Sequence, residues 1–96
     1  MLIIAGKMYV AIEHREAHLA SLEDFIRRSR NEPGCLDFTI AADPVEAGRV
    51  NLFERWASKE QLEAFQGRAE PPAPITDVFN EDVTKYEIST SGPVFP

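Results

Sequence analysis

The spacing of the apolar residues in this chain changes repeatedly between the period of a strand and that of a helix, and this succession limits the folds open to it. Residues 2–10 form a short apolar segment rich in β-formers, typical of a central strand. From about Arg15, apolar residues recur every three or four positions, which predicts an amphipathic helix ending near Asn31. Alternation over residues 35–41 and a second β-rich segment over residues 49–56 then predict a β-hairpin.

The second half of the chain again changes from helix to strand. Ser58 and Gln61 have the spacing of a capping box and predict the start of a short amphipathic helix. A proline-rich link over residues 70–75, a brief helical turn over residues 76–80 and a last strand over residues 83–88 follow. The order βαββαβ predicts a ferredoxin-like α+β sandwich with both helices on one face of an antiparallel sheet.

Composition limits the partners of the chain. Sixteen acidic and ten basic residues give a formal charge of −6, and the only basic cluster is Arg27, Arg28 and Arg30, so we expect no binding to nucleic acid. The single cysteine, Cys35, and the lack of Cys/His spacing suited to zinc predict no metal and a reducing, cytoplasmic location. No apolar run approaches the roughly 18 residues of a membrane span, so we expect no membrane contact.

Alternation also divides the strand side chains into a set that faces the helices and an outer set. Ile3, Tyr9 and Phe53 fall in the outer set and would form an exposed apolar patch on a monomer, which predicts a homodimer with two sheets face to face. Asp37 and Arg55 are candidates for a cross-strand or cross-subunit ion pair on that face. The alternative is a monomer with a half-polar outer sheet face.

Two short motifs resemble those of the antibiotic biosynthesis monooxygenase (ABM) family. Residues 33–38, PGCLDF, are similar to the family pattern P-G-C-L-x-[FY] at a strand start, and residues 53–56, FERW, to its pattern [FY]-E-x-W at a strand end. The resemblance covers residues 2–88, so we expect an ABM-like domain over residues 1–90 and a C-terminal tail over residues 91–96. It implies a dimeric α/β-barrel that oxidises a small phenolic or quinol substrate with dioxygen and without a cofactor.

The chain departs from the family pattern at positions used for catalysis. Catalytic members commonly carry a histidine on or just after the second helix, where residues 65–68 read FQGR. The haem-degrading branch relies on an asparagine of the first strand, for which Gly6 and Met8 are the nearest positions, and this argues against haem binding. An aromatic-polyketide branch has an asparagine where this chain has Leu52. The alternative function is therefore a non-catalytic small-molecule-binding or stress-related dimeric module.

We expect Glu54, Trp56 and His18 to be the catalytic residues. Alternation turns Glu54 toward the helices, where burial would raise its pKa and suit a general base; the alternative is a carboxylate held by backbone N–H groups or an arginine. Trp56 offers a flat surface to an aromatic substrate, unless it only fills the core. His18 lies beside the apolar stripe of its helix and could accept a proton, unless it faces solvent.

Five apolar residues complete the predicted site for a small aromatic molecule. They are Phe38, Met8, Leu22, Ile26 and Leu52. For the first four, ordinary core packing is the alternative.

Overall fold

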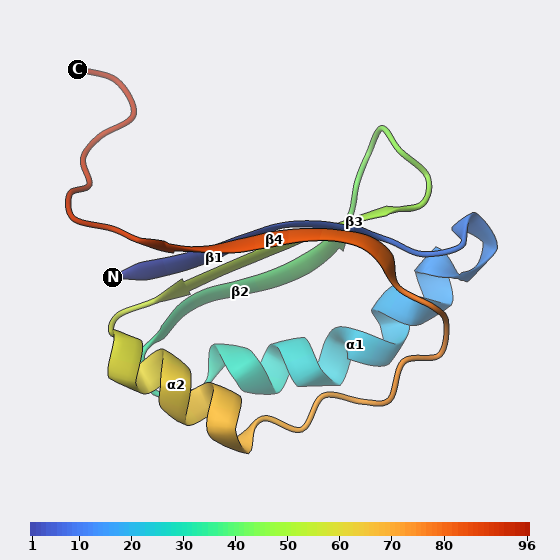
Figure 1. Cartoon of the computed structure of the whole chain (residues 1–96), viewed down its shortest axis with the longest axis horizontal. Coiled ribbons are helices and arrows are strands. Elements are labelled where there is room, and N and C mark those ends of the chain that lie inside the picture. The colour runs from blue at the N-terminus through green and yellow to red at the C-terminus, as the bar shows by residue number, and fades with distance from the viewer.

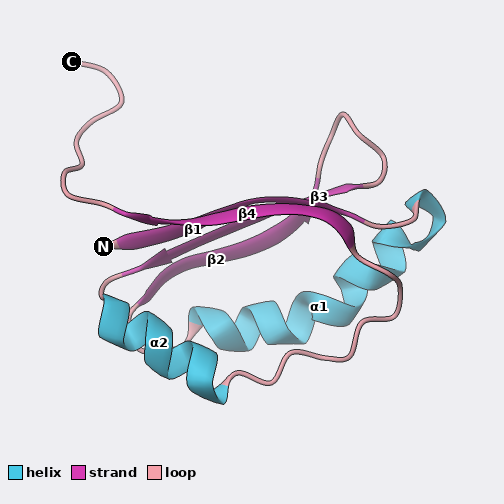
Figure 2. Ribbon diagram, viewed as in Figure 1, coloured by secondary structure: helices cyan, strands magenta, loops and turns pink.

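The computed structural model describes residues 1–96 and confirms the ferredoxin-like α+β fold (Figures 1 and 2). Its elements are β1 (Leu2–Tyr9), the 3₁₀ helix η1 (Ile12–His14), α1 (Arg15–Arg30), β2 (Cys35–Ala42), β3 (Arg49–Trp56), α2 (Lys59–Arg68) and β4 (Phe79–Glu87). All neighbouring strands are antiparallel, in the order β2-β3-β1-β4. Both helices cover the same face of this open sheet, and the other face is left bare (Figure 2).

The helix ends follow from local sequence. Ser58 Oγ accepts a hydrogen bond from the Gln61 backbone N–H at 3.2 Å, as an N-cap residue does. The Ser58 hydroxyl in turn donates to Gln61 Oε1 at 3.1 Å, so the serine cap forms as predicted, but the reciprocal bond of a capping box, from the Ser58 backbone N–H to Gln61, does not. Beyond α1, Gly34 adopts a φ of +83°, which favours glycine and lets the chain turn into β2.

An aromatic core joins the two helices to one end of the sheet. Phe65 of α2 contacts Trp56 with ring centroids 4.8 Å apart and Phe38 at 5.9 Å. Leu2 and Leu62 complete this cluster of buried residues. Because each fully buried large apolar side chain contributes about 1.5–3 kcal/mol, these five residues hold α2 on the sheet, and Phe25 of α1 packs against them.

A bulge near the start of β2 reverses two orientations that strict alternation over residues 35–41 predicts, Leu36 toward the helices and Cys35 toward the outer face. Cys35 pairs with Trp56 and Asp37 with Arg55, so β2 has one extra residue, Leu36, between them. Leu36 is therefore 49% exposed instead of facing the helices, and Cys35 packs against the core instead of facing outward. Asp37 and Arg55 pair in register but form no ion pair within the chain; Asp37 Oδ1 accepts the Phe38 backbone N–H at 2.9 Å.

The segment before β4 is extended, so the predicted helical turn over residues 76–80 is wrong. Phe79 and Asn80 already belong to β4, and Phe79 pairs with Tyr9. Pairing with β1 satisfies backbone groups that an isolated helical turn would leave to water. The two rings also stack, with centroids 6.3 Å apart.

The C-terminal residues run away from the sheet in Figure 1. Val94 and Phe95 are 86% and 80% exposed, which is unusual for large apolar side chains. No helix of the chain combines the length and the apolar character that crossing a bilayer requires.

Candidate functional site

An apolar cavity of about 270 Å³ lies between the sheet, α1 and the proline-rich link. The sheet contributes Met8 and Ile40 to its wall, and α1 contributes His18, Ser21 and Leu22. The segment between α2 and β4 contributes residues 71–74 and Val78, and β4 contributes Glu81. In Figure 1 this segment runs below α1 as the orange link that returns to β4. A concave, largely apolar space with a few polar groups is the usual form of a small-molecule site.

His18 is the polar side chain of this cavity that most needs a partner. It is 5% exposed, and its Nδ1 atom is buried and has no hydrogen-bond partner within the protein. Burial lowers the pKa of His18, because removal from water disfavours the imidazolium. The imidazole is thus held neutral, which is the form that accepts a proton. Leaving its Nδ1 atom buried and unpaired costs about 1–3 kcal/mol of folding stability.

Glu54 and Trp56 form a separate buried pair. The Trp56 indole N–H donates to Glu54 Oε1 at 3.0 Å, and the two residues are 0% and 9% exposed respectively. Burial raises the pKa of Glu54, and the hydrogen bond from Trp56 opposes that rise. The structure places Trp56 in the core against Phe65 and not at a cavity mouth, and neither member of the pair lines the cavity.

The predicted substrate-binding residues are only partly brought together. Met8 and Leu22 line the cavity, whereas Phe38 is buried in the aromatic core. Ile26 lies in a shallow groove of about 610 Å³ over α1 and the sheet edge, beside arginines and Glu23. Leu52 borders a hollow of about 420 Å³ that also includes outer-face residues such as Lys7 and Tyr86.

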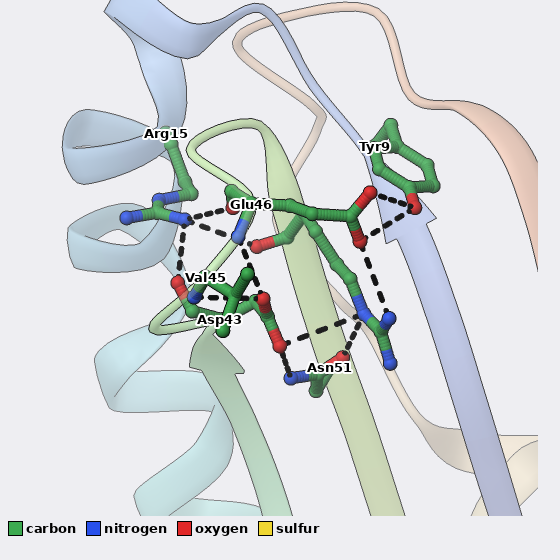
Figure 3. A network of polar contacts seen from close by, with 7 residues as sticks. Tyr9, Arg15, Asp43, Val45, Glu46 and Asn51 are labelled. Atoms are coloured by element: carbon green, nitrogen blue, oxygen red, sulfur yellow. Dashed lines mark hydrogen bonds and ion pairs between the residues drawn. The ribbon is translucent and has the colours of Figure 1, made fainter.

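A polar network fixes the β2–β3 loop close to the start of α1 (Figure 3). Asp43 accepts the backbone N–H groups of Val45 and Glu46 and the side-chain amide of Asn51, and these bonds lower the Asp43 pKa to about 2. Arg15 Nη1 donates to the carbonyl oxygens of Asp43, Glu46 and Arg49 at 2.9–3.3 Å. Because Arg15 lies one turn before His18, the network holds the end of α1 that carries the histidine.

The other members of this network are also mutually satisfied. Tyr9 OH donates to Glu46 at 3.0 Å, and Glu46 also receives Arg49 Nη1 at 3.2 Å. The hydrogen bond to Glu46 raises the Tyr9 pKa, because it favours the neutral phenol. No group of three or more His, Cys, Asp or Glu side chains is arranged to hold a metal ion. The network thus stabilises the loop by pairing its charged groups with one another.

Comparison with known proteins identifies the family. The sequence profile of the antibiotic biosynthesis monooxygenases matches residues 1–70, well over half of the chain. The chain belongs to the ABM family. An uncharacterized protein of Synechocystis is 31% identical over 62 residues, which cover 65% of this chain, and this chain spans 42% of that relative's length.

Solved structures share the ABM fold of this chain at low sequence identity. A candidate antibiotic biosynthesis monooxygenase from Deinococcus radiodurans superposes with a TM-score of 0.74, at 18% identity and over 100% of both chains. A candidate antibiotic biosynthesis monooxygenase from Nitrosomonas europaea superposes with a TM-score of 0.71 at 17% identity, over 94% of this chain and 100% of that protein. The haem degrader MhuD of Mycobacterium tuberculosis was solved with two haems in its active site. It superposes with a TM-score of 0.69 at 13% identity, over 97% of this chain and 100% of MhuD.

Several residues that line the cavity of this ABM domain were not predicted from the sequence. The prolines at positions 71, 72 and 74 predict an extended link, but not that the link covers α1. Ser21 lies on the polar border of the helix, and its hydroxyl donates to the His18 carbonyl oxygen at 2.6 Å. Glu81 was not predicted as a site residue, because it lies between the predicted helical turn over residues 76–80 and the predicted strand over residues 83–88.

Proposed function

We propose that this ABM protein is a cofactor-independent monooxygenase that oxidises a small phenolic or quinol substrate with dioxygen. The observation that carries this proposal is a buried, neutral and unpartnered histidine, His18, at an apolar cavity of about 270 Å³. The shared family supports an ABM-type activity. Met8 and Leu22 form apolar walls for the substrate ring, and the proline-rich link closes the cavity on the side of α1.

His18 supplies the one group that the chemistry needs from the protein. It accepts the hydroxyl proton of the phenol, and the resulting phenolate passes one electron to dioxygen. The two radicals combine into a ring peroxide anion, which takes the proton back from His18. The resulting ring hydroperoxide loses water, together with the hydrogen of the attacked ring carbon, to leave a quinone carbonyl. One oxygen atom thus enters the product and the other leaves as water, and the substrate provides all the electrons.

The proposed active form is a homodimer in the reducing cytoplasm, where the one cysteine stays free. On the outer sheet face, Phe53 lies beside Ala5 in register, and Tyr86 lies beside Ile3. Tyr86 is 50% exposed, so this strip offers apolar area to a second copy of the chain. Across such an interface Asp37 and Arg55 are free to pair with their counterparts in the partner.

Two other functions make different demands on the cavity. Haem does not fit this cavity of about 270 Å³. A cavity of about 150 Å³ holds a single benzene ring, whereas a porphyrin joins four pyrrole rings in one plane. A non-catalytic module needs the same cavity but no proton acceptor. Binding of an aromatic ligand without turnover would favour that module.

Oxygen consumption tests the proposal. The purified, metal-free protein is incubated with a panel of one- and two-ring hydroquinones, and oxygen uptake is followed above the autoxidation rate. We expect uptake that falls at least about 100-fold in His18→Asn, since a positioned base contributes typically 10²–10⁴-fold.

Glu54→Gln is the matched comparison, because it removes the other buried titratable group without touching the cavity. We expect it to retain activity. If Glu54→Gln abolishes uptake and His18→Asn retains it, the base is Glu54 and the present assignment is wrong. If the parent protein never exceeds autoxidation on the whole panel, the oxygenase function itself fails.

A further inference from the structure

The cavity next to His18 contains a single charged side chain. Among its eleven lining residues, only Glu81 carries a formal charge, and there is no lysine or arginine. The other polar side chains are His18, which burial keeps neutral, and Ser21, whose hydroxyl already donates within α1. The electrostatic character of the cavity therefore depends on one carboxylate.

The structure positions Glu81 through a bulge in β4. Lys7 pairs with Asp82 and Tyr9 with Phe79, so two residues of β4, Asn80 and Glu81, lie opposite the single residue Met8. Asn80 takes the extra backbone bend, with a φ of +50°. Glu81 thus remains on the side of the sheet that carries the helices, next to Met8 and the proline-rich link.

The negative charge of Glu81 is not compensated within the protein. Glu81 takes part in none of the ion pairs of the structure, which instead join residues of α1, the β2–β3 loop and α2. A ligand in the cavity therefore meets a free carboxylate. A second negative charge a few ångströms away is repelled, and a polar O–H group is accepted as a hydrogen-bond donor.

We propose that Glu81 sets the charge selectivity of this cavity, which takes uncharged hydroxylated compounds of one or two rings and rejects their carboxylated analogues. The size limit follows from the volume, since a cavity of about 150 Å³ holds benzene and this one has about 270 Å³. The inference rests on the proposed function for the choice of a phenolic ligand. It adds the residue that discriminates between a neutral substrate and an acid.

Binding to the full-length protein tests this inference without any need for turnover. Isothermal titration calorimetry at pH 7 compares 2-naphthol with 6-hydroxy-2-naphthoic acid, which has the same ring system and one carboxylate. We expect 2-naphthol to bind about tenfold or more tightly than the acid. Glu81→Gln should reduce this preference to less than about threefold, and Glu81→Lys should reverse it.

Glu87→Gln is the matched control. Glu87 lies on the same strand and the same sheet face, and the change removes the same charge, but six residues of strand separate it from Glu81 by about 20 Å. We expect it to keep the parent preference. Equal binding of the two ligands to the parent, no binding of 2-naphthol, or an equal loss of preference in both glutamine variants would each overturn the inference. Tight, selective binding of 2-naphthol without oxygen uptake would sustain it and refute only the proposed oxygenase function.

Discussion

At the scale of single residues, burial acts in opposite directions on two titratable groups of this protein. It lowers the pKa of His18 and raises that of Glu54, because in each case the charged form loses its water. Glu54 has the indole N–H of Trp56 as a donor, whereas Nδ1 of His18 has no partner. Both shifts make the free energy of unfolding depend on pH.

The His18 shift predicts a loss of stability on acidification. The unfolded chain protonates this histidine near its ordinary pKa of 6.5, but the folded chain does so only at lower pH. Below about pH 6.5 the unfolded state therefore binds more protons, and the free energy of unfolding falls by up to about 1.4 kcal/mol per pH unit. Urea unfolding of His18→Gln at pH 7, 6 and 5 should show a flatter dependence. Equal slopes in the parent and in His18→Gln would contradict the prediction.

The Glu54–Trp56 pair predicts a substitution whose cost depends on pH. Trp56→Phe removes the only donor to a buried carboxylate, so at pH 7 we expect a loss of about 2 kcal/mol beyond the loss at pH 4. At pH 4 the raised pKa of Glu54 leaves this carboxyl protonated in the folded state, and the missing donor matters less. Chemical unfolding at both pH values measures the difference. In a Glu54→Gln background this extra cost should vanish, and its persistence there would rule out the carboxylate as its origin.

At the scale of elements, the two edge strands each carry a bulge that changes which side chains face the helices. The bulge in β2 turns Cys35 inward and leaves Leu36 exposed. The bulge in β4 brings Phe79 onto Tyr9 and keeps Glu81 beside the cavity. The proline-rich link between α2 and β4 adds a rigid wall, since its prolines have little backbone entropy to lose.

The bulge in β4 depends on a residue that tolerates a left-handed conformation. Asn80→Val places a β-branched side chain at a φ of +50°, and we expect it to cost about 1–3 kcal/mol of stability. Thr84→Val, at an exposed and regular position of the same strand, serves as the control and should change stability by less than about 0.5 kcal/mol. Thermal or urea unfolding distinguishes them. Similar effects of the two valines would show that Asn80 is not strained.

At the scale of the whole molecule, the helices cover one face of the sheet and leave the other to solvent (Figure 2). That bare face carries Phe53 near its centre, on a strand flanked by β1 and β2. A stable dimer buries about 800 Å² per partner, which a four-stranded sheet face can supply.

The proposed dimer predicts a monomer-forming substitution. Phe53→Glu places a charge at the centre of the outer face, and two such charges would meet across the interface, so we expect a folded monomer with an unchanged circular dichroism spectrum. Val45→Glu adds the same charge at a loop position that is 88% exposed and should remain dimeric. Sedimentation velocity gives the mass of each. A parent protein that sediments as a monomer at micromolar concentration would refute the dimer.

The order of the elements, the cap of α2 and the resemblance to the ABM family could be predicted from the sequence, because these depend on the periodicity and chemistry of neighbouring residues. It placed His18 beside an apolar stripe and Glu54 toward the helices. The burial of His18 at a cavity, the full enclosure of Trp56, and the part of the link and Glu81 in the candidate site became visible only in the folded chain. Those outcomes depend on strand register and on where a distant segment crosses α1, and no local pattern encodes either.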